Sequence, residues 1–543
     1  MLFKMNILRF SVYNICKVML KARLTTDNQW IIVESDNAVE MKQLRLSYTK
    51  KIPNWYIIKK KASYANVDET FMNSYGMIPK GLWLELVKIC KKYNYSLQFT
   101  EDFNCRIKNC NITREDFDAF IDNLFSNSSL IKKDYQLDGV FNILQYQNCC
   151  AEVSTSGGKT FMTYLLFKYM IDKLGFKHIL YVTPKTDLTT QSSDKFADYD
   201  KACNIQSNWT YNEIHGAAKK KEEYNETIVF GNYQSLCKKK KSFFDKYDVV
   251  IIDECHHTVA KSIRSILNKC DNAKYKIGLT GTFPKEDTYE NFILQSYIGP
   301  VVYRLSSYDL INKENFATPV IVSVFELKYL EQEKMEAMYN LRMTKDKDDP
   351  TAGGKLLAME KMLARESKLR FKYIVEMILK TTKNSLVIFS DIQNDYGVKV
   401  YNYLKENSDK SVYYIDGSVA PKNREAIKQE MENDDTGNTI IVASVGCFTE
   451  GIDIANMWNI FLIESTKSDT TLAQLLGRGM RRHPKKDKTM MIDFVDDFRY
   501  GQGYQADNYL YRHGKERQSI YRKRGFPCKV FSISIKPTSI ALV

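Results

Sequence analysis

The stretch VVIIDECH, residues 249–256, joins an uninterrupted apolar run to two adjacent carboxylates. The run Val249–Ile252 predicts a fully buried strand, because all of its side chains are apolar. Asp253 and Glu254 stand at the carboxyl end of that strand, where burying two charges is costly unless they hold something positive. A Mg²⁺ ion that carries nucleotide phosphates is the usual partner. The stretch therefore predicts a nucleotide site; a carboxylate pair that caps the next helix is the alternative.

Upstream, the segment STSGGKT connects a predicted strand to the helix predicted over residues 161–173. Its two adjacent glycines let backbone amides close around phosphate oxygens at the positive end of the helix. Lys159 is predicted to reach the β- and γ-phosphates, and the Thr160 hydroxyl to ligate Mg²⁺. The complete phosphate-loop pattern has a glycine where Val153 stands, so a chance turn is the alternative. The residues predicted to surround the phosphates are Ser154, Thr155, Ser156, Gly157, Gly158, Lys159 and Thr160.

Downstream, the stretch QLLGRGMRR, residues 474–482, supplies clustered arginines. Arg478 and Arg481 are three positions apart, so on a helix they share a face. They are predicted to neutralise charge that develops on the γ-phosphate, as arginine fingers do. A basic helix that binds nucleic acid is the alternative. With Asp253 holding Mg²⁺ and Glu254 polarising the attacking water as general base, the arginines predict an ATP cleft between two lobes. Hydrolysis would open and close that cleft, which converts chemical energy into domain motion.

The composition is that of a globular, basic protein. Its 543 residues predict about three or four domains at the usual size of roughly 100–200 residues each. The net charge of +14 indicates a polyanionic partner, nucleic acid before membrane, although a merely soluble basic protein is the alternative. The chain has no run of about 18 uncharged apolar residues, so no membrane span is predicted. A cytoplasmic monomer is the expectation, in the host cytoplasm if the chain is encoded by a phage.

The cysteines do not form a metal-binding pattern. Twelve are scattered along the chain without zinc-finger spacing, which favours reduced thiols in a cytosolic protein. Cys255 and His256 follow the carboxylate pair and have no partner set for a metal. They are predicted instead to relay the state of the nucleotide.

From residue 129 onward, short apolar strands alternate with amphipathic helices, which is typical of parallel α/β sheets. The polar, glycine-containing stretch 342–354 predicts a linker between two such sets. The predicted fold is α/β: two tandem parallel-sheet domains with a small α+β amino-terminal domain and a short carboxyl-terminal extension. The expected parts are a start-site extension at 1–18, an accessory domain at 19–128, sheet domains at 129–341 and 363–500, a linker at 342–362, and a basic, aromatic extension at 501–543.

Local patterns predict individual elements. Helices are expected over residues 81–92 and 113–125, the second with Thr113 and Asp116 as a capping box. The tyrosines of the extension, such as Tyr509, are predicted either to stack on bases or to pack on the second sheet domain. Lysine runs such as Lys59–Lys61 are solvated surface or nucleic-acid contacts. Strands are expected at 28–34, 55–58, 178–182, 227–230, 249–252, 275–279, 385–390, 412–415, 439–443, 458–462 and 489–493.

The order of these motifs resembles that of superfamily 2 helicases and translocases, which have two RecA-like lobes. Over residues 135–481, further segments resemble that family's motifs: Tyr135-Gln136, Thr183-Pro184-Lys185, Gly231–Leu236, Leu279–Thr282, Val387–Ser390, Thr449–Asp453 and Gln474–Arg481. The resemblance implies that the nucleotide also contacts Tyr135, Gln136, Gly451 and Asp453, and that Gln474 acts in catalysis. It implies roles in nucleic-acid contact or coupling for Thr183, Pro184, Lys185, Gln234, Thr280, Thr282, Phe389 and Thr449.

The whole chain further resembles the UvsW type of phage DNA repair and recombination helicase, on Asp253–His256, Ile78–Leu82 and Asn508–Arg517. This resemblance implies an enzyme that uses ATP and Mg²⁺ to unwind branched DNA in 3′ to 5′ direction, acting on forks, D-loops and Holliday junctions. It also implies that the amino-terminal domain adds DNA contacts. The resemblance begins near Met19, so residues 1–18 are interpreted as a start-site artefact rather than a presequence.

Two departures from the family pattern, Gly281-Thr282-Phe283 and Asp453, concern the subtype and not the activity. Other readings of the motifs are an RNA helicase, the motor of a restriction complex, or a DNA-binding protein on a motor fold without activity. The intact lysine, carboxylates and arginines argue against the last.

Overall fold

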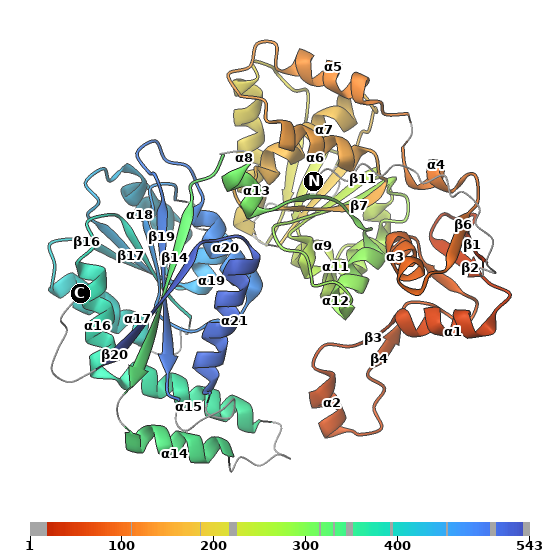
Figure 1. Ribbon diagram of the computed structural model, residues 1–543. Helices are drawn as coiled ribbons and strands as arrows, with labels where there is room; N and C mark the ends of the chain where they lie inside the picture. Colours follow the sequence, from red (N-terminus) through yellow and green to blue (C-terminus); the bar gives the residue numbers. More distant parts are fainter. Residues whose placement is uncertain are drawn as a thin grey trace.

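The computed structural model describes residues 19–109, 111–184, 186–216, 225–313, 316–329, 332–343, 351–390, 395–451, 454–499 and 507–535. It contains two parallel sheets of seven strands each and a four-stranded sheet in the amino-terminal part. The two large sheets, each flanked by helices, form separate lobes, and the amino-terminal part lies beside the first lobe (Figure 1). The predicted fold, two tandem RecA-like domains with a small α+β amino-terminal domain, is confirmed. Among the described residues, no helix is long and apolar enough to cross a bilayer.

The amino-terminal domain is a small mixed sheet covered by helices. Strand β1 pairs with β2 in antiparallel and with β6 in parallel orientation. Alternate residues of β1 are buried, as expected for a sheet with one face against a core. The strands are β1 (Met19–Leu24), β2 (Trp30–Glu34), β5 (Met77–Pro79) and β6 (Ser96–Phe99), and the helices are α1 (Ala38–Ser47), η1 (Lys80–Leu82), α3 (Trp83–Tyr93) and α4 (Phe103–Ile107).

One predicted strand is wrong. Residues 55–58 begin helix α2 (Trp55–Lys61), between the paired strands β3 (Thr49–Lys51) and β4 (Asp68–Thr70). The segment lies outside the four-stranded sheet, so no neighbouring strand completes its backbone hydrogen bonds. A helix satisfies those bonds internally, and the lysines that follow are good helix formers. The apolar run therefore lies on a projecting element and not in a core.

The first lobe has the strand order β13-β7-β12-β11-β8-β10-β9. Its central strands are buried along their length, as the apolar runs predict. Helix α7 is buried over Phe161–Met170, because it is apolar on all sides. The strands are β7 (Asn148–Val153), β8 (Ile179–Thr183), β9 (Tyr211–Ile214), β10 (Ile228–Asn232), β11 (Val249–Asp253), β12 (Tyr275–Thr280) and β13 (Val301–Leu305).

The helices of this lobe are α5 (Arg114–Leu124), α6 (Asp134–Leu144), α7 (Lys159–Asp172), α8 (Thr186–Ala202), α9 (Tyr233–Leu236), α10 (Lys241–Phe244), η2 (Cys255–Val259), α11 (Lys261–Lys269), α12 (Tyr289–Tyr297) and α13 (Ser307–Asn312). Thr113 caps α5 as predicted, and its Oγ1 accepts from the Asp116 backbone N–H at 3.1 Å.

The second lobe has the strand order β16-β17-β15-β18-β19-β14-β20. Its strands are β14 (Val320–Tyr329), β15 (Ser385–Phe389), β16 (Ser411–Ile415), β17 (Thr439–Ser444), β18 (Asn459–Leu462), β19 (Thr489–Asp497) and β20 (Cys528–Ile535). Its helices are α14 (Gln332–Met343), α15 (Ala352–Glu366), α16 (Lys368–Leu379), α17 (Tyr396–Glu406), α18 (Pro421–Asn433), α19 (Val445–Gly451), α20 (Asp469–Gly479) and α21 (Tyr509–Lys523).

The expected boundary between the sheet domains, at residue 341, differs from the structure. Strand β14 pairs with β19 and β20, so the second sheet takes in residues from Val320 onward. The expected linker 342–362 includes most of α15, whose residues after Gly354 are largely good helix formers. The expected extension from residue 501 contributes α21 and β20 to the second lobe, with Tyr511 and Tyr521 buried. These two tyrosines pack on the sheet rather than stack on bases.

Candidate nucleotide-binding site

The predicted phosphate loop turns directly from strand β7 into helix α7. Ser156 and Gly158 both have left-handed backbone conformations, with φ of 71° and 82°. The Gly157 backbone N–H donates to the Ser154 carbonyl oxygen at 2.9 Å, which closes the turn. No side chain caps the first turn of α7, so its amides face outward at the positive end of the helix. This loop forms a concave nest of amides that suits phosphate oxygens.

Tyr135 and Gln136, which the family resemblance predicts to contact the nucleotide, lie close to this loop. Gln136 is buried, and its Nε2 donates to the Gly157 carbonyl oxygen at 3.2 Å. A Cβ added at Gly158 would lie 2.1 Å from that nitrogen, at a φ of 82°, so a side chain there would strain the backbone and displace Gln136. Tyr135 is also buried, and its backbone oxygen accepts from the Tyr303 hydroxyl at 2.6 Å. Gln136 therefore supports the shape of the phosphate loop directly.

The carboxylate pair faces the loop lysine. Lys159 Nζ donates to Glu254 Oε1 at 2.5 Å. Burial alone would raise the pKa of Glu254, but the ammonium of Lys159 and the nearby His256 outweigh it and hold that pKa well below its ordinary value. Burial raises the pKa of Asp253, and the negative charge of Glu254 raises it further, whereas the ammonium of Lys159 lowers it. A cation at this position would favour the charged form of both carboxylates.

A Mg²⁺ ion fits the donor set at this end of the sheet. Thr160 lies in the first turn of α7, and Asp253 ends the strand β11 two positions away in the sheet from β7. Among the described residues, no group of three or more His, Cys, Asp or Glu side chains surrounds a common point. Mg²⁺ retains waters and binds phosphate oxygens, so one carboxylate and one hydroxyl are a sufficient protein contribution.

His256 links the carboxylates to the next strand. Its Nδ1 lies 2.9 Å from Thr280 Oγ1 and 3.4 Å from Glu254 Oε2. Thr280 Oγ1 in turn lies 2.9 Å from the Thr282 carbonyl oxygen. Glu254, His256 and Thr280 therefore form a continuous polar path from the nucleotide side to the segment after β12. Cys255 is fully buried and lies next to Gly278, so only His256 of the predicted relay pair has the geometry for it.

The two arginines have different surroundings. Arg478 lies in the last turn of α20, but the helix ends at Gly479 and Arg481 follows it, so the two do not share a helix face. Burial lowers the pKa of Arg478 to about 10, and the carboxylate of Glu254 partly offsets this effect from across the cleft. Burial also lowers the pKa of Arg481 to about 10, but its compensating charge is Glu432 of the second lobe. Arg478 is thus the arginine that faces the carboxylate pair.

The lobes touch where the arginine helix meets the phosphate loop. Ser156 Oγ donates to the Gly477 carbonyl oxygen at 2.7 Å. A Cβ added at Gly477 would lie 2.2 Å from Thr155 Cβ, so only glycine permits this approach. Sequence reasoning did not single out Gly477, although it stands beside Arg478 within the motif. Gln474 lies one turn earlier on α20 and is partly buried.

The other predicted residues are less directly placed. Thr183 is buried at the end of β8, Pro184 follows it, and Gln234 lies on α9 after β10. Phe389 is fully buried with its ring on Gly397, so it does not face a nucleic-acid surface. Lys185 and Asp453 lie outside the described residues. Thr449 and Gly451 belong to α19, without described side chains.

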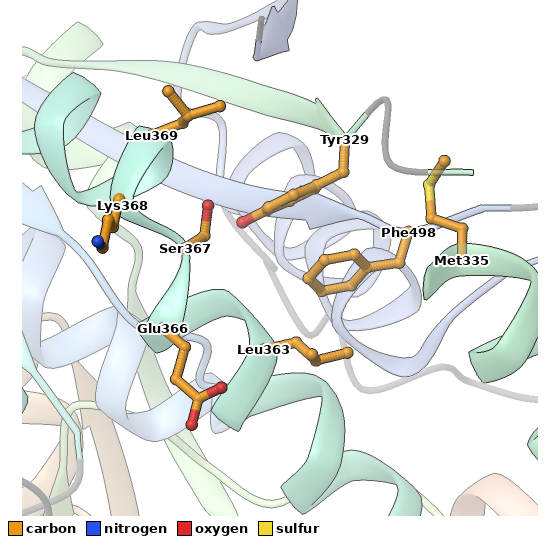
Figure 2. A pocket seen from close by; sticks show the side chains of 8 residues that line it. All are labelled: Tyr329, Met335, Leu363, Glu366, Ser367, Lys368, Leu369 and Phe498. Carbon is orange, nitrogen blue, oxygen red and sulfur yellow. The ribbon is translucent and has the colours of Figure 1, made fainter. Parts of the chain in front are cut away.

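A separate pocket of about 310 Å³ lies in the second lobe (Figure 2). Its aromatic wall is formed by Tyr329 and Phe498, whose ring centroids are 4.2 Å apart. It is lined by Tyr329, Met335, Leu363, Glu366, Ser367, Lys368, Leu369 and Phe498. None of these belongs to the phosphate loop, the carboxylate pair or the arginine segment, so this pocket is not the nucleotide cleft.

Comparisons with known proteins agree with this geometry. Residues 129–285 match the family described as type III restriction enzyme, res subunit, and residues 369–483 match the helicase conserved C-terminal domain. The ATP-dependent DNA helicase uvsW of Enterobacteria phage T4 is 28% identical over 467 residues, covering 83% of this chain and 87% of its own. The putative ATP-dependent helicase IRC3 of Saccharomyces cerevisiae is 27% identical over 283 residues, covering 49% of this chain and 37% of its own.

Among solved structures, a fragment of a putative HsdR subunit of a type I restriction enzyme from Vibrio vulnificus has a similar fold. Its TM-score is 0.52 at 20% identity, over 78% of this chain and 72% of that one. The fold, the converging motifs and the two family matches lead to one conclusion: the chain is a superfamily 2 helicase that resembles the UvsW type, and it is an ATP-dependent enzyme.

Proposed function

We propose that this helicase remodels branched DNA, such as forks, D-loops and Holliday junctions, during phage recombination, repair and replication. The observation that carries the proposal is its likeness, along most of both chains, to a phage protein named as an ATP-dependent DNA helicase. The net charge of +14 supports a polyanionic partner. The proposal includes action as a monomer in the host cytoplasm.

Nucleotide binding is assigned to one face of the first lobe. The amides and side chains of residues 154–160 would hold the phosphates, with Lys159 as the compensating cation. Tyr135 and Gln136 would contact the adenine, and Thr160 and Asp253 would hold Mg²⁺. Gly451 and Asp453 would complete the site from the second lobe. When bound, Mg·ATP supplies the phosphoanhydride whose hydrolysis drives the motion.

The Lys159–Glu254 ion pair has a consequence for catalysis. While Lys159 Nζ donates to Glu254 Oε1, that carboxylate is not available as a proton acceptor. Transfer of the ammonium to phosphate oxygens frees Glu254 to orient a water and take its proton at a carboxylate oxygen. Arg478, with Gln474 and Arg481 beside it, then stabilises the developing charge from the opposite lobe. The free carboxylate therefore exists only when the phosphate position is filled.

Coupling to nucleic acid is assigned to the edge where the strands of both lobes end. Glu254, His256 and Thr280 connect the cleft to Thr282, and Thr183, Pro184, Lys185, Gln234 and Thr449 complete the proposed coupling set. Because Ser156 and Gly477 hold the lobes in contact at the loop, a change in the loop is passed to the second lobe. In this scheme the amino-terminal domain, whose sheet and helices run from β1 to α4, is an accessory DNA-contacting domain.

A projecting arm supports that role of the amino-terminal domain. The arm, residues 49–70, consists of β3, α2 and β4 and projects from the amino-terminal domain beyond α1 (Figure 1). Its aromatic rings are exposed: Tyr56 is 53% and Tyr64 91% accessible. Lys51 Nζ lies 4.4 Å from the centroid of the Trp55 ring. Exposed rings among lysines can stack on bases while the ammonium groups meet phosphates.

Replacing Tyr64 by alanine is expected to weaken binding of forked DNA about 5-fold or more, since stacking contributes about 1–3 kcal/mol per base. Thermal unfolding should not change, because the ring is almost fully exposed. Tyr75→Ala is the matched control, as Tyr75 is 80% exposed in the same domain but outside the arm. Fluorescence anisotropy with a labelled fork measures the DNA affinity of the two variants. Equal affinities of the two variants would remove the arm from the DNA-contacting surface.

The central experiment measures ATP hydrolysis with no nucleic acid, single-stranded DNA, forked DNA and RNA at equal nucleotide concentration. Forked DNA is expected to give the largest stimulation, because the accessory domain and both lobes can then be engaged together. Stimulation by RNA alone would favour an RNA helicase and overturn the DNA assignment. Hydrolysis with every polymer but no strand separation would favour a translocating motor of the restriction type, and no hydrolysis would leave only a DNA-binding role.

A further inference from the structure

The arginine helix α20 is fixed at its far end by the carboxyl-terminal helix α21. Arg524 directly follows α21, and its Nε and Nη2 donate to Asp469 Oδ1 at 2.9 Å and 2.7 Å. Asp469 is the first residue of α20, where a carboxylate also complements the positive end of the helix. This ion pair attaches the beginning of α20 to a helix distant in sequence.

A second, buried contact connects α21 to β19 and to the segment that leads into α20. Arg517 is fully buried on α21 and holds both oxygens of Asp493 at 2.8 Å. Its Nη1 also donates to Ser465 Oγ at 3.0 Å and to the Thr466 carbonyl oxygen at 3.2 Å. These residues precede α20, so the entry into the arginine helix is tied to β19 and α21 together.

The other end of α20 is held by the segment that crosses between the lobes. The Thr318 backbone N–H donates to the Met480 carbonyl oxygen at 2.8 Å, and Thr318 Oγ1 donates to that of Arg481 at 2.9 Å. Thr489 Oγ1 donates to the Gly479 carbonyl oxygen at 2.7 Å. With both ends held, α20 spans about 14 Å from Asp469 to Arg478, at a rise of about 1.5 Å per residue.

The end of α21 also meets the connection to the phosphate loop. Gly525 has a φ of +79°, and a Cβ added there would lie 2.7 Å from Tyr308 Cδ2. Tyr308 belongs to α13, whose first residue, Ser307, has its Oγ 2.6 Å from Ser154 Oγ. The loop, α13 and the end of α21 therefore form one packed path, and Arg524 extends that path to α20.

We propose that Arg524, acting through Asp469, is a positioning residue that sets the orientation of α20 and so the placement of Arg478 against the phosphate loop. This inference rests on the proposed function of Arg478. The Arg524–Asp469 pair is partly exposed, with side-chain accessibilities of 23% and 43%. It therefore contributes little to the stability of the lobe, whereas a misplacement of about 1 Å at a reacting centre can cost about 10²-fold in rate.

Arg524→Ala is expected to lower kcat for DNA-stimulated ATP hydrolysis about 10-fold, with KM for ATP and thermal unfolding unchanged. Arg524→Lys should recover most of the rate, because the ammonium keeps the charge at Asp469. Arg522→Ala is the matched control, since it removes an exposed arginine two residues earlier and should leave kcat unchanged. Asp469→Asn should give the same loss as Arg524→Ala, and the double variant no more than either.

An unchanged kcat in Arg524→Ala, or additive losses in the double variant, would overturn the positioning role. If Arg524→Ala lowers kcat and also lowers thermal stability and nucleotide affinity, the pair has a merely structural role. That result would also overturn the positioning role. Arg478→Ala is measured in parallel. If that variant keeps wild-type hydrolysis, the proposed function of Arg478 fails first, and the two failures are thereby distinguished.

Discussion

Arg478→Ala is expected to lower kcat for ATP hydrolysis about 10³-fold or more, the range of an arginine finger. The side chain of Arg478 is partly buried on the side of Glu254, and its Cζ lies 5.0 Å from the centroid of the Phe448 ring. Charge that develops in a site of low effective dielectric constant is stabilised far more strongly than in solution. Nucleotide binding should persist, because the phosphate loop belongs to the other lobe.

Two further variants make this result specific. Arg481→Ala is expected to have a smaller effect, since the charge facing Arg481 is Glu432 of its own lobe. Arg522→Ala, an exposed arginine of the second lobe, should leave kcat unchanged. Single-turnover hydrolysis and binding of a fluorescent ATP analogue measure the two properties separately. An equal loss of binding and hydrolysis in Arg478→Ala would contradict a role confined to the transition state.

Much of the first lobe was predictable because its signals are local. The apolar run Val249–Ile252 forms a buried strand, and the lysine and carboxylates that follow two such strands meet at one edge of the sheet. The carboxyl ends of parallel strands lie at one edge of the sheet. Two motifs that each follow such a strand are therefore expected near each other, as Lys159 and Glu254 are. No long-range contact had to be known for that part of the site.

The second lobe was less predictable because its sheet takes in β14 and β20, two strands that lie outside the expected domain at residues 363–500. Val320–Tyr329 is an apolar segment, but nothing local indicates that it joins the sheet beside β19 and β20. The helix end at Gly479 likewise separates Arg478 from Arg481, whereas spacing alone placed them on one face. Gly477 has its role only because Thr155 of the other lobe approaches it. Each of these depends on a partner distant in sequence.

Glu254→Gln is expected to lower ATP hydrolysis about 10²- to 10⁴-fold, the contribution typical of a general base. The amide keeps the shape of the side chain but cannot take the proton of the attacking water. Lys159 also loses its ionic partner, so the ammonium becomes free for phosphate oxygens without first breaking an ion pair. Binding of the fluorescent ATP analogue should therefore be retained or become tighter.

Measuring both hydrolysis and nucleotide binding distinguishes the roles of Asp253 and Glu254. Asp253→Asn removes the proposed Mg²⁺ ligand, so it should weaken nucleotide binding in Mg²⁺ as well as hydrolysis. Glu254→Gln should lower hydrolysis without weakening nucleotide binding. Glu115→Gln, an exposed carboxylate on α5, is the matched control and should match the wild type in both measurements. Hydrolysis by Glu254→Gln within about 10-fold of wild type would be too high for the loss of a general base. In that case the contact between Lys159 and Glu254 would instead serve to hold the loop in shape, and another group would activate the water.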